Sequence, residues 1–490
     1  MIMNQSSEFL MKIRNIVSGS GVSLSFSEEA IKETAQVESR SKWPFIGRRL
    51  DLRGKTTFTL GSMEVAFSVE KDGEDYILGV HSADVAELIP VGSALDKVAF
   101  SKGRSAFFPE KTYHMIPEPI SDGLCALREG EESFTVSVFI RINGVGKVKS
   151  VKFAESVIKV TANCESKEVE SLFFAIDVSS VGFLRYKYYS VLQQLENMFV
   201  AGAILKMARE NRGAADIDTA IRTFSRKGIR GNITSVGFEK LSDPDRLVRE
   251  IISAAGVEIA KFFDKHSIPC PYRRRAPMLK EDCKLLRAFL VSVCIDASKV
   301  SDKTLVSFAI NVAHGNRNEE LILAKVKELL PSAACSLEAG FHGGLGTKHY
   351  VRFAYPVSRY GDLAVQRLIK AIVNCGEDYS KLDTKYMEKC ALLAVMSVNE
   401  NEPKVKAVEK RISNLYTIEH LKNNSSKTYI GTVWNVSEDG IEVCLDNSCK
   451  GFLKKGGDFV QGQRVILKVA EADLNKETVL FDVVSMSEDF

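Results

Sequence analysis

The sequence predicts an α+β protein, in which a mixed sheet surrounded by helices is followed by a small C-terminal β-barrel. Three patterns support this fold class. The region from Asp51 to about residue 160 is rich in strand-forming residues, whereas residues from about 170 to 330 repeat apolar side chains at helical spacing. Residues 426–487 form short apolar runs separated by Gly, Asn and Asp turns. The length of 490 residues fits two or three domains.

The composition is that of a globular protein in a reducing compartment. Hydrophobic residues make up 45% and charged residues 26%, which excludes a disordered or fibrous chain. Lys and Arg outnumber Asp and Glu by only 66 to 63, so the net charge does not by itself indicate a nucleic-acid partner. The ten cysteines contain no C-x-x-C pair and are interpreted as reduced core residues. No apolar run approaches the roughly 18 residues of a membrane span.

Residues 1–45 are polar and mixed, and we interpret them as a lead-in segment. A helix is expected over residues 27–38, because Ser27 can cap its first turn and Glu28 and Glu29 suit the positive end of the helix dipole. The first fifteen residues lack the pattern of a secretory signal. A cytoplasmic location is therefore expected, with organelle targeting left open.

The elements of the central region can be assigned from periodicity. Strands are expected within residues 58–70, 74–89 and 134–142. Helices are expected within residues 188–211, 247–266, 362–374 and 385–400, the last followed by a charged stretch over 399–411. Five short strands between Tyr429 and Val484 suit a barrel of the OB type.

Several motifs resemble the ribonuclease II and ribonuclease R family. RRLDLRGKTTFTL at 48–60 is similar to the opening R-x-D-L-R of that family, and the run at 78–127 is similar to its L-G-V-H-I-A-D-V … L-S-x-G-L-C-S-L. The segment at 342–367 resembles H-F-G-L … Y-x-H-F-T-S-P-I-R-R-Y-x-D-L-x-x-H-R, with a further match at 209–219 and a weaker one at 270–277. With the barrel, the resemblance extends over residues 46 to 487.

The resemblance implies a catalytic domain over residues 46–420 and an RNA-binding OB-fold barrel over 426–487. Enzymes of this family degrade single-stranded RNA from its 3′ end, and two magnesium ions lie between the phosphate and a carboxylate cluster spelled A-K-D-x-D-D-A. Magnesium requires such hard oxygen ligands, and two ions stabilise the attacking and leaving oxygens. Single-stranded RNA is thus the expected partner, with neither DNA nor a membrane expected.

The carboxylates are missing from the matching segment. Aligned on its A-x-S-V end, the sequence places Ser62, Met63, Glu64 and Val65 where the family has D-x-D-D. Ser358 stands where the first arginine of R-R-Y would contact phosphate, and Arg359 remains. The resemblance therefore implies no intact catalytic set, with Glu64 and Arg359 as vestiges. No cofactor is expected, and Mg²⁺ only if the chain is active.

Other residues could still contact RNA. Phe107 falls where the family has a tyrosine near the terminal nucleotide, although AFFP could equally bury both of its rings in the core. Arg273 belongs to a basic run between prolines, which suggests an exposed loop and either a solvated face or a phosphate contact. The barrel could be a packing module, but its aromatic and basic residues favour RNA. The expected RNA-binding residues are Phe107, Arg273, Arg359, Arg367, Trp434, Phe452 and Lys454.

Several polar residues have a simpler structural interpretation. Asp51 and Asp84 lie at turns or strand ends, where Asp caps backbone amides, and Asp362 precedes a helix that it could cap. His81 and His342 have no second His or Cys at metal spacing and are expected to be structural.

Three hypotheses remain. The leading one is a binding module, a degenerate family member that holds RNA or docks on a protein partner. The second is an active exoribonuclease with relocated ligands, using Glu64, Asp84 and a nearby acid such as Glu70 or Asp96 with a single ion. The third is a structural subunit of a larger complex. The sequence leaves open which RNA or protein is bound, whether another activity has replaced the lost one, and the oligomeric state.

Overall fold

The structure is a computed structural model that describes residues 7–39, 47–175, 178–214, 221–226, 233–376, 378–446, 449–455 and 457–486. Its centre is a seven-stranded sheet with the order β1-β8-β7-β4-β3-β2-β9. The strands are β1 (Leu50–Leu52), β2 (Phe58–Leu60), β3 (Ser62–Asp72), β4 (Asp75–Ala83), β7 (Glu132–Ile142), β8 (Val148–Lys159) and β9 (Ala162–Cys164). The three predicted strand regions are confirmed, and Gly61, with φ of 65°, divides the first into β2 and β3.

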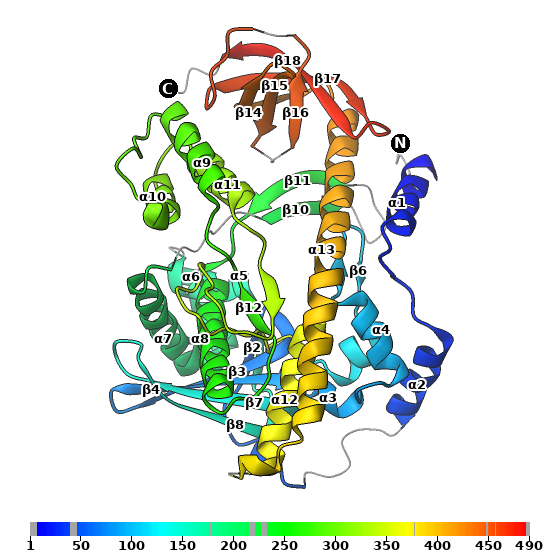
Figure 1. The fold of residues 1–490 in the computed structure, drawn as a ribbon, viewed down its shortest axis with the longest axis vertical. Coiled ribbons are helices and arrows are strands. Elements are labelled where there is room, and N and C mark those ends of the chain that lie inside the picture. Colours follow the sequence, from blue (N-terminus) through cyan, green and yellow to red (C-terminus); the bar gives the residue numbers. More distant parts are fainter. Residues whose placement is uncertain are drawn as a thin grey trace.

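Helices and short elements surround this sheet and confirm the mixed α+β class (Figure 1). Helices α7 (Leu192–Asn211) and α8 (Asp243–Lys265) pack on the strands and supply much of the main apolar core, and α12 (Tyr360–Cys375) contacts β7 and β8. The smaller elements of this region are α3 (Val85–Leu88), α4 (Ala94–Lys102), β5 (Ala106–Phe107), β6 (Thr112–Tyr113), η1 (Pro119–Leu124), α5 (Ser166–Phe174), α6 (Val178–Lys187), β10 (Ile221–Arg226), β11 (Ile233–Glu239), β12 (Tyr272–Arg274) and β13 (Ala334–Ser336).

A single long helix, α13 (Thr384–Asn423), runs from the sheet to the barrel along the long axis of the molecule (Figure 1). The sequence predicted a helix only as far as residue 400, because Pro403 and a charged stretch follow. The helix nevertheless continues to Asn423 and is 40 residues long in all, since Val405, Val408 and Ile412 keep the three- and four-residue spacing of a buried face.

The C-terminal strands close into a five-stranded barrel, as predicted. Its order is β14-β15-β16-β18-β17. The strands are β14 (Thr428–Ser437), β15 (Gly440–Leu445), β16 (Lys450–Leu453), β17 (Arg464–Asp473) and β18 (Thr478–Met486). The barrel lies beside a three-helix group, α9 (Lys280–Ser292), α10 (Asp302–Ala313) and α11 (Glu319–Leu329), whose apolar core includes the barrel residue Trp434.

The lead-in segment forms two helices, α1 (Ser7–Gly19) and α2 (Glu28–Ser39). The predicted second helix is confirmed, and the Ser27 hydroxyl accepts a hydrogen bond from the Ala30 backbone N at 3.2 Å. Helix α1 packs against α13, where the rings of Phe9 and Tyr416 meet edge to face at 5.0 Å between centroids. The part of the lead-in that the structure describes is thus packed against the rest of the chain.

Buried polar side chains of the sheet form hydrogen bonds with one another. The two ring nitrogens of His81 lie 3.0 Å from the Ser68 hydroxyl and 2.7 Å from the Ser137 hydroxyl, and Ser137 lies 2.5 Å from Ser156. Burial lowers the pKa of His81 to about 3, so the ring is neutral and structural, as predicted. The cysteines carry reduced thiols. Among the described helices, none is long and apolar enough to cross a membrane.

A glycine turn holds α4 against α12 and α13. Gly103 has φ of 69°, and its carbonyl accepts a hydrogen bond from the Tyr360 backbone N at 2.9 Å. A Cβ atom at Gly103 would lie 2.7 Å from the Cβ of Asn401. This close approach leaves room only for hydrogen and brings the chain after α4 next to the start of α12.

Replacement of this glycine tests the contact. Gly103→Ala and the control Gly130→Ala each place a side chain at positive φ, which costs about 1–2 kcal/mol, but Gly130 has open space around it. Gly103→Ala is expected to lose a further ~1–3 kcal/mol from overpacking, measured as the shift in the urea midpoint. Equal shifts for the two variants would contradict the tight contact with α13.

Candidate functional site

The acid that remains in the catalytic motif and the serine that replaces the motif arginine lie against each other. Glu64 projects from β3, and Ser358 lies in the loop that leads into α12. The Ser358 hydroxyl donates a short hydrogen bond to Oε1 of Glu64. Two residues that are 294 positions apart in the sequence are thus in contact. They lie where the resemblance puts the metal centre and its phosphate-binding arginine.

The Glu64 carboxyl is largely withdrawn from solvent. Its Oε2 atom is buried and has no hydrogen-bond partner among the residues that the structure describes. Burial raises the pKa of this carboxyl, and the hydrogen bond from Ser358 and the charge of Arg359 oppose the effect without cancelling it. A carboxyl whose proton is retained more strongly is a poorer ligand for a hard divalent cation.

Arg359, the retained arginine, is held by its own neighbours. Its Nη2 lies 2.7 Å from Oδ2 of Asp362, and its guanidinium lies 4.7 Å from the centroid of the Tyr355 ring. The same Asp362 oxygen accepts the Tyr355 backbone N–H at 3.0 Å. Asp362 is buried in the first turn of α12, and the N-cap residue is Arg359, so the predicted capping role of Asp362 is wrong.

The acids required by the relocated-ligand hypothesis do not gather around Glu64. Asp84 pairs with Arg49 and Lys370, each at 2.7 Å, whereas Asp96 pairs with Arg367 at 2.7 Å. Glu70 pairs with Lys55 at 2.9 Å. Each carboxylate is therefore neutralised within its own ion-pair network, so these residues fit neither a single ion beside Glu64 nor a two-magnesium centre.

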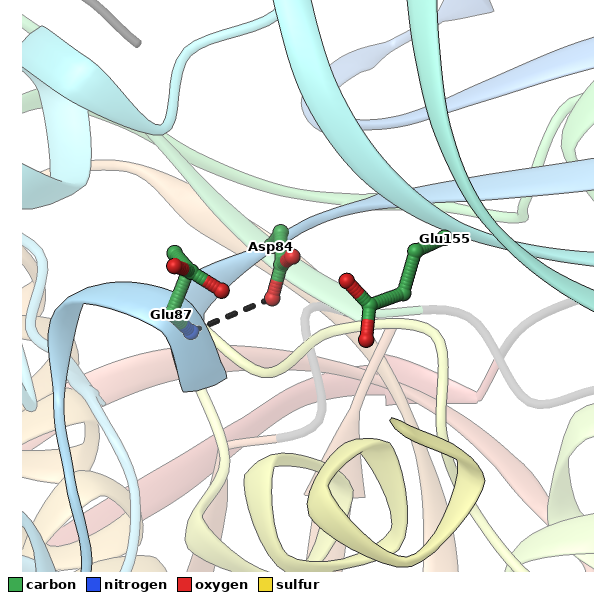
Figure 2. A group of neighbouring side chains, drawn as sticks. All are labelled: Asp84, Glu87 and Glu155. Carbon is green, nitrogen blue, oxygen red and sulfur yellow. Dashed lines mark hydrogen bonds between the residues drawn. The ribbon is translucent and has the colours of Figure 1, made fainter. Parts of the chain in front are cut away.

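One acidic group does form, at the junction of β4, α3 and β8. Figure 2 shows Asp84, Glu87 and Glu155 turned toward one another, with the Asp84 side chain accepting the Glu87 backbone N–H at 3.1 Å. Arg49 and Lys370 lie within salt-bridge distance of all three carboxylates. The two cations supply the charge that a metal ion would supply, and Asp84 caps α3 as a structural residue, as predicted.

Basic side chains gather beside the Glu64–Ser358 pair. We use the term arginine cluster for Arg104, Arg273, Arg352, Arg359 and Lys406. Glu402 of α13 binds three of them, with N–O distances of 3.4 Å to Arg273, 3.3 Å to Arg352 and 3.6 Å to Lys406. Arg104 pairs with Glu409 at 3.1 Å, and its backbone forms a bridge with that of Arg359.

Three members of the arginine cluster were not predicted from the sequence. Lys406 lies outside the motifs that carry the resemblance, and Arg104 lies inside the run at 78–127 but at none of the positions that match the family pattern. Arg352 lies inside one of them, at the position where Y-x-H-F-T has histidine, and this exchange of histidine for arginine was the available signal. Only the fold shows that Arg104 lies near Arg359 and Arg352, and that Lys406 lies near Arg104 and Arg352.

Phe107 is placed as an aromatic contact rather than as a core residue. Its ring, on β5, is 52% exposed, whereas the ring of Phe108 is buried and packs on Tyr113. The Phe107 backbone N donates to Oε1 of Glu409 at 2.8 Å, and the Arg104 guanidinium lies 5.5 Å from the ring centroid. The alternative that AFFP buries both rings is therefore wrong, and Phe107 borders the arginine cluster.

Three of the expected RNA-binding residues are buried, which contradicts direct RNA contact for Arg367 and Trp434 and an exposed loop for Arg273. Arg367 pairs with Asp96 and donates to the Ile89 carbonyl at 2.8 Å. Arg273 lies in β12 rather than in an exposed loop, and its side chain is enclosed beside Glu402. Trp434 is 5% exposed between the barrel and the three-helix group, with the Lys450 ammonium 3.8 Å from its ring centroid. These side chains stabilise the packing.

The remaining barrel residues stay predictions. Phe452 is 40% exposed on β16, and Lys454 is exposed directly after that strand. The family motif at 209–219 begins with Arg209, whose buried Nε lies 2.9 Å from a carboxylate oxygen of Glu250. Residues 215–219 of this motif lie outside the described part of the chain.

Comparison with curated proteins gives three informative relatives, all ribonucleases R. The chain is 24% identical over 460 residues to ribonuclease R 2 of Lactococcus lactis, a match that covers 92% of this chain and 68% of the relative. Ribonuclease R of Aquifex aeolicus is 26% identical, over 92% of this chain and 64% of the relative. Ribonuclease R of Thermotoga maritima is 28% identical, over 85% of this chain and 59% of the relative. The chain thus spans about three fifths to two thirds of these relatives.

Solved structures share the fold at low sequence identity. The apo form of Mycoplasma genitalium RNase R superposes with a TM-score of 0.85 at 18% identity, over 98% of this chain and 78% of that one. Yeast Ssd1, described as a pseudonuclease, gives a TM-score of 0.64 at 17% identity, over 86% of this chain and 53% of that one. The RNB domain model matches residues 49–374, which is about two thirds of the chain, and the protein belongs to the RNB family.

Proposed function

We propose that this protein is an RNA-binding member of the RNB family that has lost hydrolytic activity. The observation that carries the proposal is the hydrogen bond from Ser358 to Glu64. It occupies the place where the family motifs put an arginine and a carboxylate cluster. The one acid left in the motif is thus hydrogen-bonded to the serine that replaces the arginine, while Ser62 and Val65 stand where the other carboxylates would be.

The chemistry of phosphodiester hydrolysis explains why these replacements matter. Two divalent ions must be neutralised and oriented by several carboxylates before they can activate water and stabilise the leaving oxygen. Glu64 is the only acid between Gly54 and Glu70, and burial favours its neutral form. Ser358 cannot supply the bidentate contact that an arginine makes with phosphate. The residues present therefore do not fit the metal-dependent reaction.

Retention of RNA binding is supported by what remains around the lost centre. Phe107 offers an exposed ring on which a base can stack, and the adjacent arginine cluster offers cations for the backbone. The RNase R of Mycoplasma genitalium, which has the same fold, has been solved with ribose methylated single-stranded RNA and with double-stranded RNA. Single-stranded RNA is accordingly the proposed ligand.

A digestion assay tests the loss of activity. The protein is incubated with a 5′-labelled single-stranded RNA in Mg²⁺ or Mn²⁺, with Thermotoga maritima ribonuclease R as the positive control. We expect no ladder of shortened products, because Glu64 alone cannot hold two ions. A metal-dependent ladder that disappears in Glu64→Ala would refute the proposal and support the active alternative.

The pH dependence of stability tests the state of Glu64. Because the pKa of Glu64 in the folded chain lies above 4.5, the folded state binds more protons than the unfolded state above pH 4.5, and stability falls as pH rises toward the folded pKa. The Glu64→Gln variant cannot ionise at this position, so it does not lose stability in this way as pH rises. Its amide oxygen can still accept the hydrogen bond from Ser358. Its thermal midpoint should exceed that of the wild type by a margin that grows from pH 4 to pH 7.

The matched control for this variant is Glu70→Gln, at the partly exposed end of the same strand. Its midpoint should show no such growing margin. A constant difference between Glu64→Gln and the wild type across the pH range would contradict the buried, proton-retaining carboxyl.

Removal of the exposed ring tests RNA contact. Phe107→Ala should weaken binding of a single-stranded RNA by about 1–3 kcal/mol, or roughly 5- to 150-fold in Kd, whereas Phe107→Tyr should retain it. Phe174→Ala on α5 removes a ring that is similarly exposed and serves as the control. Filter binding measures all four proteins, and unchanged affinity in Phe107→Ala would rule out stacking at this position.

A further inference from the structure

One arginine is lost and another gained within the same motif. The family pattern Y-x-H-F-T-S-P-I-R-R-Y matches residues 350–360, where arginine is replaced by serine at Ser358 and histidine is replaced by arginine at Arg352. The number of arginines in the motif is therefore unchanged. The cation has moved from beside Glu64 to beside Glu402, where its Nη1 lies 3.3 Å from the carboxylate.

The surroundings of Arg352 carry an excess of positive charge. The five basic residues of the arginine cluster are paired with three carboxylates, those of Asp362, Glu402 and Glu409. Although burial opposes ionisation of Glu402, the surrounding cations hold the pKa of its carboxyl below the ordinary value. Glu402 is thus ionised and still leaves the cluster with a net positive charge, which favours an anion.

The cluster combines enclosed and accessible donors. The side chain of Arg273 is 4% exposed and that of Arg352 is 27% exposed, whereas Lys406 is half exposed. The buried Nε atoms of Arg273 and Arg359 have no hydrogen-bond partner within the described part of the chain. Buried N–H donors of this kind are normally satisfied, so an oxygen ligand at the cluster would complete their hydrogen bonding.

Neighbouring residues fix the orientation in which a strand would lie. The Arg104 backbone bridges to that of Arg359, and the exposed Phe107 ring stands beside the Arg104 guanidinium. A base stacked on Phe107 would therefore place its phosphates toward the arginine cluster and the Glu64–Ser358 pair. A guanidinium binds a phosphodiester bidentately and requires no metal ion to do so.

We propose that the arginine cluster, through the relocated Arg352, binds the phosphodiester next to the 3′ end of a single-stranded RNA without a metal ion, and so shields that end from other nucleases. This inference rests on the proposed RNA-binding function and adds the ligand, its terminus and its metal independence. The cations of Arg352 and Lys406 take the place of the charge that magnesium ions supply in an active centre.

Binding measurements in EDTA test the proposal directly. A 5′-labelled single-stranded RNA is titrated with the wild type, with Arg352→Gln and with Lys404→Gln, a matched loss of an exposed cation on α13. Wild-type affinity should be the same in EDTA and in Mg²⁺. Arg352→Gln should bind about tenfold more weakly, with a salt slope smaller by about 0.7, whereas Lys404→Gln should match the wild type.

A circular RNA of the same sequence isolates the contribution of the 3′ end. The Arg352→Gln defect should disappear with the circle, because no terminus can enter the cluster. Wild-type protein should also slow digestion of the linear strand by added Thermotoga maritima ribonuclease R, and Arg352→Gln should do so less. Thermal unfolding and the variant Arg352→His, which has the family residue, check that a defect does not arise from misfolding.

The outcomes separate this inference from the proposed function. If the wild type binds RNA but Arg352→Gln binds equally well, or if its defect persists on circular RNA, the terminal site is wrong and RNA binding stands. Binding that requires Mg²⁺ also overturns the site. If the wild type binds no RNA, the proposed function itself is wrong.

Discussion

The chemistry of this protein depends on the contact between β3 and the loop before α12. In that contact the Ser358 hydroxyl donates to the Glu64 carboxyl, and the surrounding burial favours the protonated acid. Both elements are fixed by packing that does not involve the pair, because α12 is buried along most of its length and β3 lies inside the seven-stranded sheet. The scaffold of the family is therefore intact, while the group at its centre is a hydrogen-bonded pair instead of a carboxylate cluster.

Charge outside this centre is balanced internally. Asp84 and Asp96 lie near the same helix, yet each is neutralised by a cation of α12, Lys370 for the first and Arg367 for the second. Buried charges are tolerated only when they are paired in this way, since desolvation of an isolated carboxylate is costly. Two of the acids that a relocated metal centre would need, Asp84 and Asp96, are thus already paired with cations of α12. An unpaired carboxylate near Glu64 would have to be created by breaking one of these networks.

The sequence predicted the fold better than it predicted the use of its side chains. Periodicity and turn residues were sufficient for β3, β4, β7 and the barrel, because burial imposes a regular spacing on their side chains, whereas β8 and the short β1 and β9 were not singled out. Family motifs also placed Glu64 and Ser358 in one site, although nothing in the sequence showed that they hydrogen-bond. Arg367 and Trp434 were misassigned, because a basic or aromatic residue in a motif can face the core when it finds a partner, here Asp96 and the three-helix group. Which way a side chain points depends on long-range packing.

The replacements at the centre remove acidic residues and keep basic ones. This pattern favours retained ligand binding over a loss of both catalysis and binding. A carboxylate cluster without its metal ions would repel a phosphate, because its negative charges would lie uncompensated close to the backbone of the RNA. In this chain the loss of carboxylates at Ser62 and Val65 reduces that repulsion, and burial raises the pKa of Glu64. Arg352 and Arg359 meanwhile keep positive charge beside the same place. These features support the proposal that the centre holds a phosphodiester and does not cleave it.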